Sequence, residues 1–252
     1  MNASLLLLAD SRLPAGGHAH SGGAERAVAT GAVRDEHDLA AFLHGRLTTT
    51  GRVAASLAAA SCALATTLLP DATPAGGPAS GGGEAGWTAL DAEADARTAS
   101  PAQRAAARTQ GRLLLRVARR IWPSPVLDGL ALAVPSPHHP VALGAVAAVA
   151  GCPPRDAALA AAYHSVTGPA TAAVRLLGLD PVAVHRLLAT LSDTLDAIAG
   201  TAAASPHPDP TPPEGSPSEA PDVWAALPAH AAPALDLLAE QHVRATTRLF
   251  VS

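Results

Sequence analysis

The feature that most constrains the fold is the helical spacing of the apolar residues. Only two isoleucines occur, Ile121 and Ile198, and no run alternates β-branched with polar residues. A half-buried strand needs that alternation, whereas an amphipathic helix needs steps of three and four residues, so the pattern favours helices throughout. Aromatic residues make up only 2% of the chain, so the helices must pack through Ala, Leu and Val. We predict an all-α protein, a single helical domain over residues 1–252 with about nine or ten helices.

Capping residues and prolines mark the expected helix boundaries. Ser100-Pro101 is the clearest start, because serine can accept the third amide, proline suits the first position and Gln103 can reach back. Gly51 and the pair Gly168-Pro169 are expected to interrupt helices. The expected helices are 5–9, 35–50, 53–69, 100–122, 140–150, 156–166, 170–177, 180–198 and 233–249.

Two segments have a composition that disfavours a packed core. Residues 73–86 are rich in Gly and Pro, and residues 205–221 are rich in Pro with interspersed Asp and Glu. We predict that both are low-complexity inserts between helical parts.

Composition and missing motifs exclude several classes of function. The formal net charge is −4 and no lysine is present, which argues against a nucleic-acid binder and rules out a phosphate-binding loop that needs lysine. No Gly-x-Ser-x-Gly motif appears, and two cysteines, Cys62 and Cys152, cannot build a disulfide framework. No secretory signal or good membrane-spanning helix is visible, so we expect a soluble, cytoplasmic protein without a membrane partner.

Histidine pairs are the candidate metal ligands. His18 and His20 lie two residues apart in a Gly-rich loop, where both imidazoles could reach one ion, and His138-His139 precedes a proline. Two imidazoles alone are an incomplete site, and exposed or capping histidines are the favoured explanation for both pairs. His164 lies within an apolar helix, which favours a hydrogen-bonded core histidine.

The segment between residues 5 and 25 is the densest in turn residues. Gly16 and Gly17 allow positive φ or close backbone approach, and Ser21 is expected to cap the next helix. Three other blocks accompany it: Gln110-Gly111-Arg112 with Leu114, residues 172–176 (AAVRL), and residues 248–252 (RLFVS). The first block consists of Leu6, Ala9, Asp10, Leu13, Pro14, Gly16, Gly17, Ser21, Gly23 and Glu25.

Together, in this order, the four blocks resemble the UreF family of urease accessory proteins, in an actinobacterial-type form. His18 and His20 stand where the family usually has aromatic residues, and the usual Gly-Gln pair after the Arg-Leu block is missing. The resemblance implies an all-α chaperone that is not an enzyme and that forms a homodimer. It also implies binding to the scaffold UreD (also called UreH) and to the GTPase UreG, for GTP-dependent nickel insertion into apo-urease.

In that picture nickel transits the complex, GTP is bound by UreG, and the chain has no cofactor of its own. The resemblance assigns partner contact to Pro14, Gly16, Gly17, Ser21, Glu25, Gly111, Arg112, Arg175, Arg248, Phe250 and Ser252. For Arg175 an internal ion pair is the alternative, because a charge in an apolar helix needs a partner. Arg248 and Phe250 are expected to be anchors that a partner orders, since arginine and aromatic residues are typical hot spots.

Three alternative functions stay open, and so does the role of one arginine-rich helix face. The chain could be a nickel-binding metallochaperone that uses His18 and His20, or an enzyme whose His and Ser residues meet on folding. It could also activate the UreG GTPase with an inserted arginine, for which Arg112, Arg175 and Arg248 are candidates. The arginine row along residues 104–120 is expected to be either a solvated helix face or a surface for an acidic partner.

Overall fold

The computed structural model describes residues 3–10, 12–69, 82–205 and 223–250, and within them the secondary structure is helical without a strand. The predicted all-α class is therefore confirmed. The α-helices are α1 (Ala3–Ala9), α2 (Ala24–Ala29), α3 (Glu36–Arg46), α4 (Arg52–Thr67), α5 (Gly82–Ala96), α6 (Pro101–Ile121), α7 (Pro125–Ala133), α8 (His139–Val149), α9 (Pro154–Leu177), α10 (Pro181–Thr190), α11 (Ser192–Ala204) and α12 (Pro233–Val243). Short turns η1 (Gly17–Ala19), η2 (Leu47–Gly51) and η4 (Val223–Ala226) lie between them.

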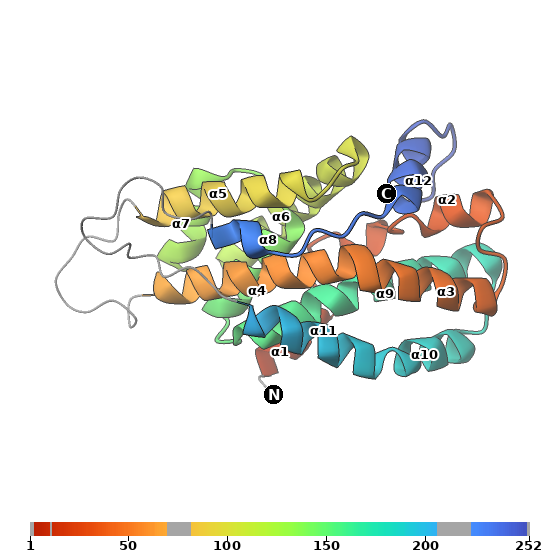
Figure 1. The fold of residues 1–252 in the computed structure, drawn as a ribbon, viewed down its shortest axis with the longest axis horizontal. Coiled ribbons are helices and arrows are strands. Elements are labelled where there is room, and N and C mark those ends of the chain that lie inside the picture. Colours follow the sequence, from red (N-terminus) through yellow and green to blue (C-terminus); the bar gives the residue numbers. More distant parts are fainter. Residues whose placement is uncertain (1–2, 11, 70–81, 206–222, 251–252) are drawn as a thin grey trace.

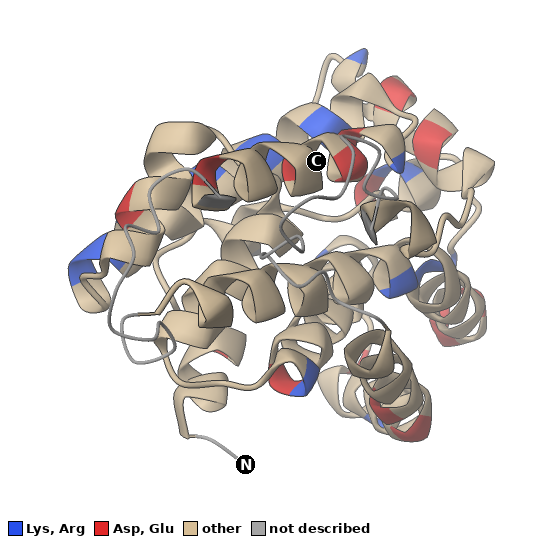
Figure 2. Cartoon of the chain, turned by 60° about the vertical axis from the view of Figure 1, so that its left-hand side comes forward, with Lys and Arg blue, Asp and Glu red and all other residues tan. Residues whose placement is uncertain are grey.

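Helices α4 and α9 form the centre of the bundle (Figure 1). Helix α8 packs on both, α6 covers α8, and α11 covers α9. Two apolar clusters meet along this centre: Leu57 and Ala161 belong to one, and Ala55 and Ala158 belong to the other. Both faces of α4 and α9 are therefore buried, which explains why their sequences carry so few charges. Charged residues gather on the outer helices in Figure 2.

Small residues let α4 and α8 approach until their backbones touch. A Cβ placed on Gly144 of α8 would lie 2.2 Å from the carbonyl oxygen of Ala58. Ser61 of α4 donates a hydrogen bond of 2.5 Å to the carbonyl oxygen of Val141. An alanine-rich core is thus closed by backbone proximity, because it lacks the large side chains that would fill a wider gap.

The predicted interruption at Gly51 is wrong. Helix α3 runs through the π-helical turn η2 directly into α4, and Gly51 has helical angles, φ −63° and ψ −42°. A Cβ on Gly51 would lie 2.8 Å from the Ser165 hydroxyl. The glycine therefore permits contact with α9.

The predicted break at Gly168-Pro169 is also wrong, because α9 continues through Pro169. Proline has no N–H, so the carbonyl of Ser165, four residues earlier, loses its helical donor. Arg46 replaces that donor: its Nε donates to the Ser165 oxygen at 2.8 Å, and its Nη1 donates to the Gly22 oxygen at 2.8 Å. A side chain from α3 thus repairs the helix and ties it to the N-terminal loop.

Other boundaries differ from expectation. The helix expected over 180–198 divides at Leu191 into α10 and α11, and the last helix ends at Val243 rather than near Leu249. Helix α5 begins inside the segment expected to be an insert, where Gly86 packs on Leu64 of α4 and Gly83 packs on Leu68, the C-cap of α4. Residues 73–81 and 206–221 of the two expected inserts lie outside the described residues. None of the helices in the described part is both long and apolar enough to span a bilayer.

Candidate interaction surface and the cavity beside it

The two ends of the chain meet at Glu25, in the first turn of α2. The carboxylate of Glu25 accepts hydrogen bonds from the backbone N–H of Leu249 at 2.7 Å and of Phe250 at 3.1 Å. His242 of α12 lies against the same carboxylate, and its other ring nitrogen lies 3.3 Å from the Phe250 oxygen. The C-terminal tail is thus placed by the chain itself, so the expectation that a partner must order Phe250 is corrected.

A shallow hollow of about 330 Å³ lies beside this tail, lined by Ala19, Arg175, Leu176, Leu249 and Phe250. Arg175 is exposed here. The internal ion pair weighed for it is not among the ion pairs of the described residues. Arg248 is exposed as well, and Ser252 lies outside the described residues. The hollow therefore joins a cation of α9 to the apolar tail.

The N-terminal loop supplies a second side of this surface. Pro14 and Gly17 are exposed, and Gly16 has φ +78°, which a residue with a side chain rarely adopts. Gly23 with φ +89° is the N-cap of α2. Ser21 is fully buried, its hydroxyl has no hydrogen-bond partner within the described residues, and only its carbonyl accepts from Ala24. The predicted capping and partner-facing roles of Ser21 are therefore wrong.

Gly111 is a packing residue. It is buried, and a Cβ there would lie 2.0 Å from the carbonyl oxygen of Pro137. It permits α6 to touch the turn before α8, so its assignment to a partner-facing surface is corrected. Its neighbour Arg112 points outward and is exposed.

The arginine row of α6 divides into two parts. Arg108 binds Asp91 at 2.9 Å and Asp95 at 2.5 Å, and Arg119 binds Asp128 at 2.6 Å. These arginines join α6 to α5 and α7. Arg112, Arg116 and Arg120 are exposed, as is Arg119 despite its ion pair, and the first three have no ion pair among those of the described residues.

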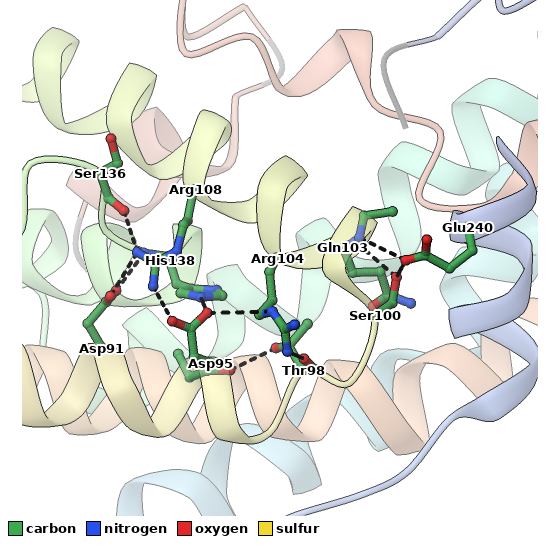
Figure 3. A network of polar contacts seen from close by, with 12 residues as sticks. Asp91, Asp95, Thr98, Ser100, Gln103, Arg104, Arg108, Ser136, His138 and Glu240 are labelled. Carbon is green, nitrogen blue, oxygen red and sulfur yellow. Dashed lines mark hydrogen bonds and ion pairs between the residues drawn. The ribbon is translucent and has the colours of Figure 1, made fainter. Parts of the chain in front are cut away.

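A polar network fixes the turn before α8 (Figure 3). The backbone N–H of His138 donates to Asp91 at 2.8 Å, and its ring Nε2 lies 2.8 Å from Asp95. Burial lowers the pKa of His138, against the opposing effect of Asp95. For Asp95 burial raises the pKa, but hydrogen bonds from His138 and Arg108 more than offset this and hold it below its ordinary value. His138 is thus a structural histidine, neither exposed nor a side-chain cap.

A cavity of about 590 Å³ lies beside the surface that the N-terminal loop and the C-terminal tail form. Its wall includes His20, His139 and His164. The rings of His139 and His164 are 5.9 Å apart between centroids. Burial lowers the pKa of His139 to about 3, aided by the nearby His164 and His20. Burial likewise lowers the pKa of His164 to about 4, although a hydrogen bond to the Leu8 backbone opposes it. His139 and His164 are therefore neutral at pH 7. His164 is half-buried in the cavity wall rather than in the core, so the core position predicted for it is corrected, while its hydrogen bond to the Leu8 backbone agrees with the prediction.

The described residues offer little to either the metal-binding or the enzyme alternative. Within the described part of the chain, no three His, Cys, Asp or Glu side chains gather in a way that would hold a metal ion. His18 has no described side chain, so its pairing with His20 stays a prediction. His138 and His242 bond to Asp95 and a backbone carbonyl respectively, not to a nucleophile. Burial raises the pKa of the Cys62 thiol to about 12, which makes it inert.

The fold and the candidate site together indicate the class of protein. In its described residues the chain is an all-helical protein whose polar groups join helices to one another and whose two ends form one surface.

Comparison with known proteins gives the particular family. A family model described as UreF matches residues 33–192. A urease accessory protein UreF from Mycobacterium sp. (strain JLS) is 47% identical over 203 residues, which cover 81% of this chain and 86% of that protein. Those from Mycolicibacterium vanbaalenii and Mycobacterium tuberculosis are 43% and 39% identical over 250 residues, 99% of this chain and 98% of theirs. The chain belongs to the UreF family, and the resemblance seen in its four blocks is confirmed.

Several residues that build the site escaped prediction. Arg46 and His242 carried no motif, and their partners are 119 and 8 residues away along the chain. One available signal was the helical proline Pro169, which implies that an outside donor must satisfy a carbonyl. Glu25 was predicted, although as a partner contact rather than as the group that holds the tail.

Proposed function

We propose that this chain is a urease maturation chaperone, an adaptor that bridges the scaffold UreD and the GTPase UreG during GTP-dependent nickel insertion into apo-urease. It performs no catalysis itself, acts in the cytoplasm and works as a homodimer, so that a two-fold assembly presents each contact surface twice. The proposal rests on membership of the UreF family, whose relatives are named urease accessory proteins.

One observation carries the adaptor role: the family's N-terminal and C-terminal blocks, 224 residues apart, are joined through Glu25. Arg175, from a third block, lines the hollow beside them with Phe250. Exposed arginine and aromatic side chains beside an apolar tail are the composition of a protein contact. That residues from three separate blocks lie together supports a single partner surface, and we assign UreD to it.

The adaptor also couples the nucleotide state of UreG to metal release. It need only bind one nucleotide state of UreG more tightly than the other, and a difference of about 1–3 kcal/mol is a useful bias. The exposed arginines Arg112, Arg175 and Arg248 are each accessible to such a partner. Replacing each arginine in turn by Gln and measuring single-turnover GTP hydrolysis by UreG separates binding from activation. If the arginine activates the GTPase, its replacement lowers the hydrolysis rate even when the adaptor is saturating.

The test of the UreD assignment is a capture experiment with purified proteins. Deleting residues 248–252 should leave the helical fold intact and reduce capture by UreD at least tenfold, because the tail lies outside every helix. The control removes an exposed cation that does not line the hollow, Arg34→Gln between α2 and α3. Undiminished capture by the truncated chain contradicts the assignment. A functional readout is urease activity after co-expression with UreD, UreG and apo-urease, with and without this chain.

A second candidate, direct nickel binding, is favoured by one observation: His20 lies near His139 and His164 in the cavity wall, and the imidazoles of His139 and His164 are neutral. Neutral imidazole is a common nickel ligand. In this reading His18 and His20 deliver the ion toward the cavity. Calorimetry compares wild type with His18→Ala/His20→Ala and with His139→Gln/His164→Gln. An unchanged nickel stoichiometry in both variants discards direct binding.

A further inference from the structure

The positive charge of Arg46 is explained neither by the fold nor by the adaptor role. Its guanidinium donates to the carbonyl oxygens of Ser165 and Gly22. These bonds use two of the five N–H groups of the side chain, and both acceptors are neutral. A carbonyl satisfies a donor but does not neutralise a charge, and a charge removed from water needs an opposite charge nearby.

No carboxylate of the described residues supplies that opposite charge, because the ion pairs there belong to other arginines and to histidines. Burial alone lowers the pKa of Arg46 to about 10, so the group still carries its charge at pH 7. Arg108 is the contrast within the same molecule. Burial lowers its pKa too, but Asp95 and Asp91 more than offset that effect. Arg46 is thus a half-buried cation that faces no carboxylate among the described residues.

Arg46 lies in the wall of the 590 Å³ cavity, with Thr50 one turn along the same helical run. The cavity wall also contains two carboxylates, and both already have partners: Asp10 binds Arg12, and Asp236 accepts from Gln103. His139 and His164, which also line the wall, are neutral imidazoles at pH 7 and bring no negative charge. The described wall therefore carries an uncompensated guanidinium, which attracts an anion.

We propose that Arg46 binds a small planar oxyanion in this cavity, of the chemical class of bicarbonate, formate and acetate. The N–H groups left on Nη1 and Nη2 are the donors, and a carboxylate-like anion matches guanidinium geometry with charge-assisted hydrogen bonds. The site goes beyond the adaptor role, since it concerns the chain alone.

The test is thermal unfolding of the full chain in formate, acetate and bicarbonate, with ionic strength held constant by sodium chloride. Specific binding raises Tm along a saturation curve, by about 5–10 °C once the oxyanion reaches about a hundred times its Kd. Arg46→Gln keeps a donor for Ser165 but removes the charge, and it should abolish the response. The matched control is Arg52→Gln, an exposed arginine close by in sequence, which should respond as wild type does.

Each outcome decides the proposal. A wild-type Tm that rises no more in the oxyanions than in chloride overturns it, whether or not any variant folds. A response that survives in Arg46→Gln overturns it as well, because the anion then binds elsewhere. If Arg46→Gln does not fold, Arg46→Lys takes its place: it keeps the charge but loses the paired geometry, and its Kd should be at least fivefold weaker. An unchanged Kd in Arg46→Lys would again contradict the site. None of these measurements involves UreD, so they are independent of the adaptor role.

Discussion

At the scale of single residues, glycines decide how closely some neighbouring segments pack. Gly144 and Gly111 lie where a methyl group would collide with the backbone of a neighbouring segment. Gly129 of α7, by contrast, faces open space. Sequence alone treats these helical glycines alike, since each is unfavourable by propensity. Only the packing of distant segments separates them.

Gly144→Ala should therefore lower the free energy of unfolding by about 1–3 kcal/mol, because the new methyl group forces α8 away from Ala58. Gly129→Ala is the matched control and should raise it by about 0.5–1 kcal/mol, because alanine restricts the unfolded chain. Urea unfolding followed by circular dichroism measures both. Equal effects at the two positions would mean that α4 and α8 are farther apart than described.

Neutral histidines in the cavity wall predict acid sensitivity. The folded chain holds His139 and His164 unprotonated down to pKa values of about 3 and about 4, whereas the unfolded chain protonates them near 6.5. The unfolded state then binds more protons between these values, so the contribution of these two histidines to the free energy of unfolding is complete above pH 6.5 and is lost as the pH falls toward 4. We expect a loss of about 1–3 kcal/mol per imidazole between pH 6.5 and 4.5.

The check is the slope of unfolding free energy against pH in that window. His139→Gln/His164→Gln should flatten it, while replacing the exposed His37 by Gln should leave it as in wild type. A slope that is unchanged in the double variant would assign the acid sensitivity to other groups.

At the scale of elements, α9 shows how a helix survives a residue that should end it. Pro169 stays inside the helix because Arg46 serves the carbonyl that proline leaves without a donor. The starts of α6 and α10 were predicted, since Ser100 and Asp180 cap the amides beside them. Ser124 caps α7 in the same way, but that helix was not predicted. Helix continuations were not predictable, because the partner that decides them comes from another element. The same reason explains why Gly51 and residues 82–86 were misjudged.

A double-mutant cycle tests this repair. Arg46→Ala leaves the Ser165 carbonyl unsatisfied and should cost about 1–3 kcal/mol of unfolding free energy. Pro169→Ala restores the N–H within the helix, so Arg46→Ala should cost about 1 kcal/mol less in that background. Pro181→Ala, at the first turn of α10, is the control and should be additive with Arg46→Ala. Additivity with Pro169→Ala as well would show that Arg46 does not compensate for the proline.

At the scale of the whole molecule, the chain closes on itself through α2, α12 and the tail. Glu240 of α12 accepts from the Ser100 hydroxyl at 2.6 Å and from the Ala102 N–H at 2.9 Å, which docks α12 on the start of α6. The tail then reaches Glu25. The sequence predicted which blocks carry the candidate site, through resemblance. It could not show that they meet, because contacts across more than 200 residues leave no local pattern.

Glu25→Gln should free the tail without unfolding the bundle, because an amide keeps one acceptor where the carboxylate offered two. A loss of about 1.5 kcal/mol makes the open tail about tenfold more populated. Carboxypeptidase digestion followed by mass spectrometry should then remove the last residues about ten times faster, while Tm stays within about 2 °C of wild type. Glu84→Gln, at an exposed position of α5, provides the control. Equal digestion rates in all three proteins would show that Glu25 does not retain the tail.

The contact between Gly144 and Ala58 has a mechanical consequence. Because the backbones of α4 and α8 touch at Gly144 and are joined there by Ser61, we expect the two helices to move together as one rigid unit. The tail and α12, by contrast, are joined to the rest of the molecule through the hydrogen bonds of Glu25 and Glu240. We therefore expect a bound partner to be able to displace the tail and α12 while α4 and α8 keep their arrangement.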